Sequence, residues 1–181
     1  MTIRTLFLAT AALTLAACGG DDTAVETAST PPPAAPAPAP APAPEPVAAF
    51  DGPPAEVTIA PIGDEMKYEQ TEFTVAPGQT VNLTFTNTAT SAAMRHNVVV
   101  LDPGTDVAQF GVAAASAADT DYIPGRFKDA VFAHTAMSGP GETVEVTFTA
   151  PTTPGDYVYI CSYPGHYVTM KGTMRVVAQA A

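Results

Sequence analysis

The sequence predicts an all-β domain of the sandwich or barrel type, which follows an N-terminal leader and a proline-rich linker. Short stretches of alternating apolar and polar residues recur in the second part of the 181-residue chain. Proline–glycine pairs, which favour turns, interrupt these stretches, for example at residues 77–78 and 103–104. Nine of the 19 prolines lie instead within residues 31–46, in a segment that cannot form a core.

Residues 1–17 have the pattern of a lipoprotein signal peptide. Arg4 supplies a positive charge, residues 6–15 are mainly apolar, and small residues lead to Cys18. The apolar run is too short for a transmembrane helix, so we expect export and removal of the leader. The ending at residues 15–18 resembles the lipobox of bacterial lipoproteins, in which the cysteine is acylated. An ordinary cleavage with an incidental cysteine is the alternative.

An acylated Cys18 determines where the protein is expected in the cell. Acyl chains anchor a protein to a membrane without spanning it, because each buried methylene contributes roughly 0.8 kcal/mol. We therefore expect an exported protein that is lipid-anchored to a bacterial membrane and faces the periplasm or the cell exterior.

Residues 18–50 are expected to form a disordered tether between the acylated cysteine and the domain. Residues 31–46 contain only proline, alanine and one glutamate, a composition that favours extended polyproline II structure. At about 3.1 Å per residue, this stretch would span roughly 50 Å. A segment that packs on a partner is the alternative to a spacer.

Residues 51–181 are long enough for one compact domain. Residues 106–119 are alanine-rich and contain no proline, which predicts one short helix on the outside of the sandwich. Apolar–polar patterns and turn signals predict strands at residues 57–59, 67–75, 81–86, 96–101, 143–149, 155–162 and 173–177.

Two segments contain the residues best suited to metal chemistry. One is residues 94–97, just before a predicted buried strand, and the other is residues 161–170. Blue copper sites surround the ion with two histidines and a cysteine and add a methionine at a longer axial distance. We therefore predict one type 1 copper ion, and the matching donors are His96, Cys161, His166 and Met170.

Such a donor set favours electron transfer, because sulfur ligands suit Cu(I) whereas imidazole also suits Cu(II). No side chain needs to act as a nucleophile or a general base, so we expect an electron carrier and not an enzyme. A copper-sequestering or copper-delivery lipoprotein is the alternative, although such proteins more often have open sites rich in methionine or histidine. Zinc would accept these ligands but would make the site redox-inactive. A structural lipoprotein without metal would not need this ligand spacing.

The remaining cysteine, histidine and methionine residues can be explained without a second metal site. Once Cys18 is acylated, Cys161 is an unpaired thiol in an oxidising compartment, and metal ligation would protect it from oxidation. An inert buried cysteine is the alternative. We assign His134 no ligand role, because no sulfur or histidine is close to it in the sequence. We expect three further methionines in packing or at the surface: Met66, Met137 and Met174.

Residues 159–166 and 170–173 closely resemble the copper-binding loop of the azurin and auracyanin family of blue copper proteins. The intervals of five positions from cysteine to histidine and four from histidine to methionine are those of this family. Residues 96–99 and 133–148 also resemble azurin segments, so that the likeness extends over residues 56–177. The lipobox and the alanine–proline tether resemble those of lipid-anchored azurins of some bacteria.

The resemblance implies a cupredoxin Greek-key β-sandwich around the copper site. It implies that His96, Cys161 and His166 are equatorial ligands and that Met170 is the axial ligand. The disulfide and the buried tryptophan of azurins are missing from this chain.

The resemblance also assigns roles to neighbours of the ligands. The Asn97 side chain is expected to brace the loop after Cys161, where Ser162 follows, and so to hold the thiolate in place. In azurins, a glycine carbonyl just before the first histidine makes a weak fifth contact with copper. Arg95 occupies this position, and it offers a backbone carbonyl without the conformational freedom of glycine.

The acidic composition limits the possible partners. The chain has 18 acidic and seven basic residues and a net charge of −11, which argues against nucleic acid as a partner. Residues 51–181 carry a net charge of −8, so we expect a basic redox protein such as a c-type cytochrome, or an oxidase or reductase. Acidity that only aids solubility is the alternative. We expect an apolar docking surface around the edge of His166, formed by Met94, Tyr163, Pro164 and Tyr167.

Overall fold

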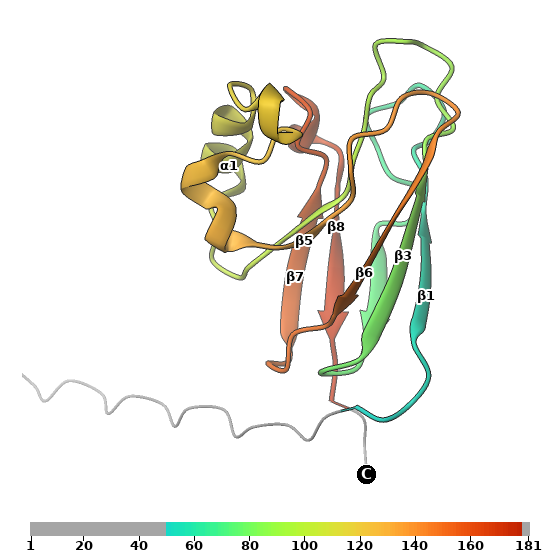
Figure 1. Cartoon of the computed structure of the whole chain (residues 1–181), viewed down its shortest axis with the longest axis vertical. Helices are drawn as coiled ribbons and strands as arrows, with labels where there is room; N and C mark the ends of the chain where they lie inside the picture. The colour runs from blue at the N-terminus through green and yellow to red at the C-terminus, as the bar shows by residue number, and fades with distance from the viewer. Residues whose placement is uncertain (1–49, 179–181) are drawn as a thin grey trace, which may run out of the picture. The chain divides into compact units, whose positions relative to one another are not determined.

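The computed structural model describes residues 50–178. The predicted leader of residues 1–17, the lipidation site Cys18 and residues 19–49 of the linker lie outside the described residues. The described part forms two β-sheets with a helix beside them (Figure 1). Its elements are β1 (Ala55–Ile59), β2 (Glu72–Val75), β3 (Thr80–Thr86), β4 (Val99–Leu101), α1 (Val107–Ala114), β5 (Val131–His134), β6 (Thr143–Thr149), β7 (Gly155–Ile160) and β8 (Lys171–Val176).

The two sheets confirm the predicted all-β sandwich. One sheet has the strand order β1-β3-β6, and the other has the order β2-β8-β7-β4-β5. β1 is parallel to β3 and β2 is parallel to β8, whereas the other neighbours are antiparallel. The chain crosses repeatedly between the sheets, so connections that are distant in the sequence meet at the same end of the sandwich.

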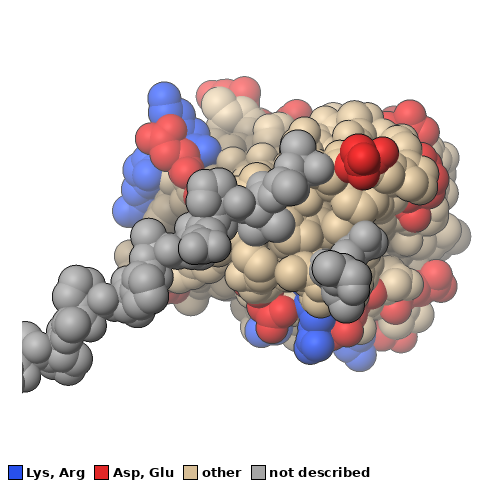
Figure 2. Space-filling view, turned by 90° about the horizontal axis from the view of Figure 1, so that it is seen from below, with Lys and Arg blue, Asp and Glu red and all other residues tan. Residues whose placement is uncertain are grey.

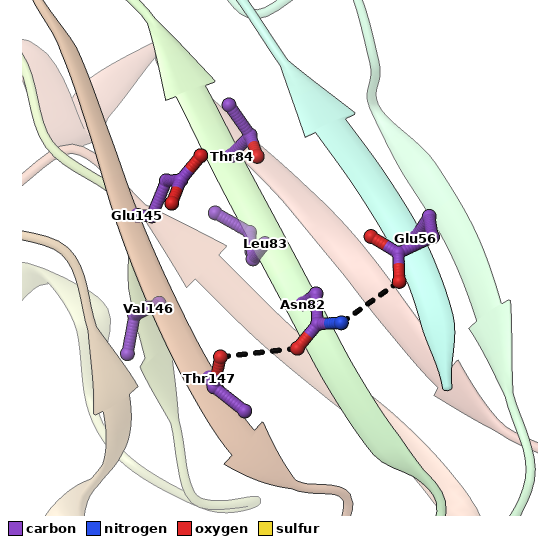
Figure 3. A pocket seen from close by; sticks show the side chains of 7 residues that line it. All are labelled: Glu56, Asn82, Leu83, Thr84, Glu145, Val146 and Thr147. Carbon is purple, nitrogen blue, oxygen red and sulfur yellow. Dashed lines mark hydrogen bonds between the residues drawn. The ribbon is translucent and has the colours of Figure 1, made fainter. Parts of the chain in front are cut away.

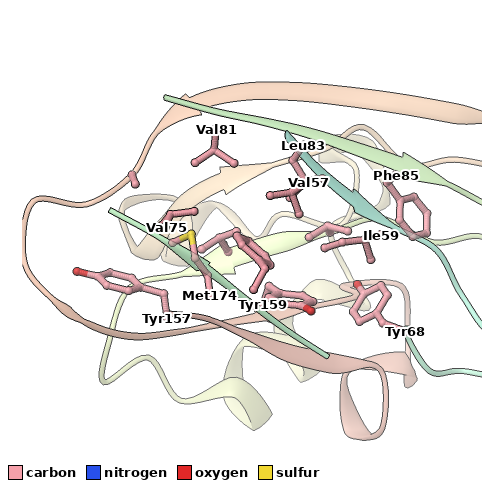
Figure 4. Packing of buried hydrophobic residues seen from close by; sticks show 14 of the residues in the cluster. Val57, Ile59, Tyr68, Val75, Val81, Leu83, Phe85, Tyr157, Tyr159 and Met174 are labelled. Atoms are coloured by element: carbon pink, nitrogen blue, oxygen red, sulfur yellow. The ribbon is translucent and has the colours of Figure 1, made fainter. Parts of the chain in front are cut away.

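The hydrophobic core lies between the inner faces of the sheets (Figure 4). Val81, Leu83 and Phe85 alternate along β3 and are all buried, as the sequence pattern predicts. Tyr68 and Tyr159 pack together in this core, with ring centroids 5.4 Å apart. Their burial fills one end of the core with aromatic rings.

The outer face of the three-stranded sheet is polar, in keeping with the strand alternation (Figure 3). Asn82 on β3 connects both neighbouring strands. Its Nδ2 donates to Glu56 of β1 at 2.8 Å, and its Oδ1 accepts a hydrogen bond from Thr147 of β6 at 3.0 Å. Side-chain bonds of this kind supplement the backbone pairing on an exposed face.

α1 packs against the outward face of the five-stranded sheet, which confirms the predicted external helix. Asp106 caps it by accepting a hydrogen bond from the Gln109 amide at 3.0 Å. Phe110 and Ala114 of the helix join a buried cluster with Val99, Leu101 and Ile160. These contacts bury the helix face that lacks polar side chains.

The helix is shorter than the predicted span of residues 106–119. The Ala117 amide bonds to the Ala114 carbonyl at 2.9 Å, a tighter pattern than that of an α-helix. Two 3₁₀ helices follow, η1 (Ala118–Thr120) and η2 (Gly125–Ala130). Residues 115–119 contain no large apolar side chain to pack on the sheet, so nothing extends the α-helix over them.

Several strand boundaries also differ from the predictions. The predicted strand 67–75 is ordered as β2 only from Glu72, because Tyr68 pairs with Pro61 in an isolated bridge. The predicted strand 96–101 is regular only from Val99, since His96 pairs with Ser138 instead. The sequence did not predict β5. β7 ends at Ile160, two residues before its predicted end, and β8 begins at Lys171, two residues before its predicted start.

The two ends of the sandwich differ in what they contain. The chain enters β1 and leaves β8 at the lower end in Figure 1, whereas the loops after β3, β5 and β7 lie at the upper end. Viewed from below, acidic side chains are spread around the margin and do not gather in one patch (Figure 2). No helix within residues 50–178 is long and apolar enough to cross a membrane.

Candidate metal centre

Three side chains converge at the upper end of the sandwich. Sγ of Cys161 lies 3.7 Å from Nδ1 of His96 and 3.7 Å from Nδ1 of His166, and the two nitrogens are 3.1 Å apart. His96 and Cys161 are fully buried, and His166 is 5 % exposed. Among the described residues, this is the group of histidine, cysteine or acidic side chains that could hold a metal ion.

The size of this triangle fits a transition metal ion. In the plane of the three atoms, the point that is equally far from all of them lies about 2.0 Å from each. This distance is close to the metal–nitrogen and metal–sulfur bond lengths of about 2.0 and 2.3 Å known for zinc sites. One sulfur and two imidazole nitrogens are also the donors of a trigonal copper site. Size and donor chemistry therefore both fit copper.

Burial keeps all three donors uncharged in the absence of a cation. Burial raises the pKa of Cys161 to about 12, although the backbone amides of Asn97 and Tyr163 act in the opposite direction. Burial, followed by the charge of His166, lowers the pKa of His96 to about 4. Burial also lowers the pKa of His166. Neutral imidazoles can ligate a metal at neutral pH, and a bound cation would compensate the negative charge of the thiolate.

The backbone around His96 is fixed by the loop after β5. The His96 amide donates to the Ser138 carbonyl at 3.0 Å, and the Ser138 amide and hydroxyl donate to the His96 carbonyl at 2.8 and 2.9 Å. Asn87, which follows β3, donates through Nδ2 to the carbonyls of Met94 and Ser138 at 2.9 and 3.1 Å. Asn87 and Ser138 were not predicted as site residues, because their contacts are made only in the tertiary structure.

The other two donors come from one turn between β7 and β8. Cys161 directly follows β7, and its amide donates to the Met170 carbonyl at 3.0 Å. Gly165 has a φ of 84°, a conformation that glycine adopts without strain, and it precedes the short 3₁₀ helix η3 (His166–Val168). The Met170 amide then donates to the His166 carbonyl at 2.8 Å. The turn therefore returns His166 and Met170 towards Cys161.

Met170 is fully buried and belongs to the same core cluster as Cys161. Its backbone pairs with Cys161 at the end of the two strands, so its side chain starts close to the three donors. Its thioether is the fourth donor that the sequence predicts.

The structure brings together Asn97 and Ser162, the residues that directly follow His96 and Cys161. Oδ1 of Asn97 accepts a hydrogen bond from the Ser162 amide at 2.9 Å, and its Nδ2 donates to the Ser162 hydroxyl at 2.8 Å. Both residues are fully buried. Thr135 adds a further connection, since its hydroxyl accepts a hydrogen bond from the Val98 amide at 3.0 Å.

Two tyrosine rings stack outward from His166. The Tyr163 ring lies edge-on to His166, with centroids 4.9 Å apart, and Tyr122 lies edge-on to Tyr163 at 5.1 Å. Tyr167 packs on α1, where Gly111 leaves room for its ring.

The four residues of the predicted docking surface around His166 differ in how far they are exposed to solvent. Met94 and Tyr163 are half-buried, whereas Pro164 is exposed. Tyr167, at the side of α1, is half-buried.

Other sequence-predicted residues lie outside the triangle. His134 is exposed on β5, and its Nδ1 lies 3.1 Å from the Thr135 carbonyl. Met137 and Met174 are buried, and Met66 is 42 % exposed, which agrees with the expected packing and surface roles. The Arg95 side chain is exposed next to His96.

Comparisons with known proteins agree with this donor chemistry. Residues 55–177 match a family described as copper binding proteins, plastocyanin/azurin family. Auracyanin-A from Chloroflexus aurantiacus is 39 % identical over 127 residues, which cover 68 % of this chain and 75 % of the relative. An azurin from Alcaligenes faecalis is 37 % identical over 99 residues, covering 54 % of this chain and 77 % of the relative.

A solved structure is similar in both sequence and fold. The dithionite-reduced auracyanin from Roseiflexus castenholzii has a TM-score of 0.62 and 41 % identity, and the match covers 70 % of this chain and 99 % of that chain. The Greek-key sandwich that the sequence resemblance implies is therefore confirmed.

Proposed function

This chain belongs to the plastocyanin/azurin family of copper-binding proteins, and from this premise we propose that it is an electron carrier that cycles one type 1 copper ion between Cu(I) and Cu(II). The observation that carries the proposal is the buried triangle of His96, Cys161 and His166, with donor atoms 3.1 to 3.7 Å apart. One thiolate and two imidazoles accommodate both oxidation states of copper.

Each ligand has a proposed atom. Nδ1 of His96, Nδ1 of His166 and Sγ of Cys161 would hold the ion, and the thioether of the buried Met170 would be the fourth, weaker donor. The backbone carbonyl of Arg95 is the candidate for a fifth contact. A copper ion held there would supply the one-electron chemistry, and the side chains would hold it without taking part in bond making or breaking.

The surrounding hydrogen bonds support rapid electron transfer because they keep the donors in place in both oxidation states. Ser138 and Asn87 fix the segment with His96, and Asn97 fixes the turn with Cys161. Ligands held by such contacts move little when the charge of the ion changes, which keeps the reorganisation small.

We further propose that electrons pass through the edge of the site at His166. Its ring is 5 % exposed and lies edge-on to Tyr163, which forms the proposed docking surface together with Met94, Pro164 and Tyr167. A small apolar surface of this kind suits brief encounters with a redox partner. The net charge of −8 on residues 51–181 favours a basic partner, such as a c-type cytochrome or an oxidase or reductase.

The proposed membrane tether is compatible with this exposure. Residues 1–17 act as an export signal, Cys18 carries the lipid, and residues 18–50 link it to the azurin-like domain of residues 51–181. The chain enters β1 at Ala55, at the end of the sandwich opposite Cys161. A tether that joins the domain there leaves the copper end free for partners on the periplasmic or external side of the membrane.

The addition of Cu(II) to the purified protein tests the proposed function. We expect an intense blue thiolate-to-copper absorption band that saturates at one equivalent, disappears with a reductant and returns on reoxidation. A colourless complex, or a band that does not return, would contradict electron transfer and favour copper storage or delivery.

A further inference from the structure

Tyr68 connects the hydrophobic core to the copper end of the sandwich. The residue is 2 % exposed, and its hydroxyl donates to the Asn97 carbonyl at 2.6 Å. Its ring packs edge-on against Phe85, with centroids 6.2 Å apart, and also contacts Tyr159 (Figure 4). The rigid packing of the ring gives its hydroxyl a fixed position.

The carbonyl that Tyr68 holds belongs to the residue that joins the two ligand segments. Asn97 follows His96 directly, and its side chain accepts a hydrogen bond from the amide of Ser162, which follows Cys161. A displacement of Asn97 would therefore move both His96 and Cys161. Tyr68 itself is distant in sequence from both segments, and its hydroxyl bonds to the Asn97 carbonyl and not to the side chain of His96 or Cys161.

We propose that Tyr68 is a positioning residue for the copper site, which acts through Asn97 to hold His96 and Cys161 at their mutual distance. This inference rests on the proposed function for its electrochemical consequence. Its structural part concerns only the hydrogen-bonded chain from Tyr68 through Asn97 to Ser162.

The direction of the electrochemical effect follows from the groups around the sulfur. Hydrogen-bond donors near a copper thiolate stabilise its negative charge and so favour Cu(I) over Cu(II). Asn97 and the turn after Cys161 form the backbone next to this sulfur, and the contacts of Asn97 with Tyr68 and Ser162 hold both in place. Loss of the Tyr68 hydroxyl would loosen Asn97, weaken this stabilisation and lower the reduction potential.

Tyr157 provides a matched control. It is buried in the same cluster, and its hydroxyl also donates to a backbone carbonyl, that of Thr153, at 3.0 Å. Thr153 does not belong to a ligand segment. Tyr68→Phe and Tyr157→Phe therefore each remove the hydroxyl of one buried tyrosine and leave one backbone carbonyl without its donor, but only the first affects Asn97.

The experiment compares these two variants in the copper-loaded and the metal-free protein. For Tyr68→Phe we expect a lower reduction potential and a shifted blue band, whereas Tyr157→Phe should retain the wild-type values of both. In the metal-free protein, hydrogen exchange of the Ser162 amide should be about tenfold faster in Tyr68→Phe, the change expected for the loss of one hydrogen bond. Tyr157→Phe should leave this exchange rate unchanged.

A second background keeps the test decisive if Tyr68→Phe is poorly stable. Combined with Asn97→Ala, which already breaks the connection to Ser162, Tyr68→Phe should cause no further shift in potential. Equal potentials and equal Ser162 exchange in the two tyrosine variants would overturn the inference. If the wild-type protein shows no blue band, the proposed function fails, and the Ser162 exchange rates still decide the role of Tyr68.

Discussion

The side-chain amide of Asn97 makes two hydrogen bonds with Ser162, although 65 positions separate the two residues. Oδ1 accepts from the Ser162 amide at 2.9 Å, and Nδ2 donates to the Ser162 hydroxyl at 2.8 Å. One side chain thus joins the segment with His96 to the turn with Cys161. The positions of two proposed copper ligands depend on this contact.

Asn97→Ala is expected to destabilise the protein and to alter the copper site. The change removes both bonds to Ser162 and leaves a buried amide without an acceptor, which should cost roughly 2–3 kcal/mol of unfolding free energy. The blue band should shift or weaken. Chemical unfolding and absorption spectra measure the two effects.

Asn82→Ala is the matched control for this change. Asn82 also makes two side-chain hydrogen bonds, but it lies on the polar outer face of β3. We expect a loss of about 1 kcal/mol or less and an unchanged spectrum. Similar spectral changes in both variants would show that the Asn97 contact has no special effect on the site.

Cys161→Ser should abolish the blue colour, because a serine hydroxyl cannot provide the thiolate from which charge is transferred to copper. His134→Ala should leave the colour intact, since His134 is exposed on β5 and lies outside the donor group. Absorption after addition of one equivalent of Cu(II) measures both. The reverse result would refute the ligand assignment.

Gly111→Ala is expected to disturb the site from a distance. A Cβ at Gly111 would overlap the Tyr167 ring close to its attachment point, so the ring and η3, which contains His166, must move. Overpacking of this kind should cost about 1–3 kcal/mol and shift the blue band. Alanine is otherwise the better helix former, so stabilisation of the protein would contradict this contact.

Gly125→Ala tests whether any glycine-to-alanine change near α1 has the same effect. A Cβ at Gly125 meets no atom within 4 Å, and the residue has no positive φ. We expect a change in stability within about 0.5 kcal/mol and a wild-type spectrum.

Copper removal should lower the thermal stability of the folded domain. An ion that binds only the folded state, present at a free concentration 100 times its dissociation constant, stabilises by about 2.7 kcal/mol. A chelator should therefore lower the melting temperature by roughly 10 °C in a domain of this size. The same chelator should have little effect on Cys161→Ser, and an equal decrease in both proteins would exclude a link to this site.

The sequence predicts those strands in which apolar and polar residues alternate along the chain. β3 and β6 agree with the predicted spans to within one residue, because one face of each strand is apolar. β5 could not be found in this way, since its four residues do not alternate and it forms by pairing with β4, where Val99 lies opposite His134. The predicted helix is longer than α1 because a high alanine content alone does not provide apolar contacts, and Ala114 is the last helix residue in the buried cluster.

The same distinction applies to the site. The donor types and the spacing of Cys161, His166 and Met170 are local, so the sequence can predict them. Asn87 and Tyr68 act through hydrogen bonds to the carbonyls of Ser138 and Asn97, which are distant in the sequence, and such contacts leave no periodic pattern. Only the tertiary structure identifies them.

A crystal structure of the copper-loaded protein, with anomalous diffraction measured on both sides of the copper absorption edge, tests the ligand assignment most directly. We expect a single anomalous peak, about 2 Å from Nδ1 of His96 and Nδ1 of His166 and within bonding distance of the Cys161 sulfur. A peak elsewhere, or one without the Cys161 sulfur beside it, would contradict the proposed copper site.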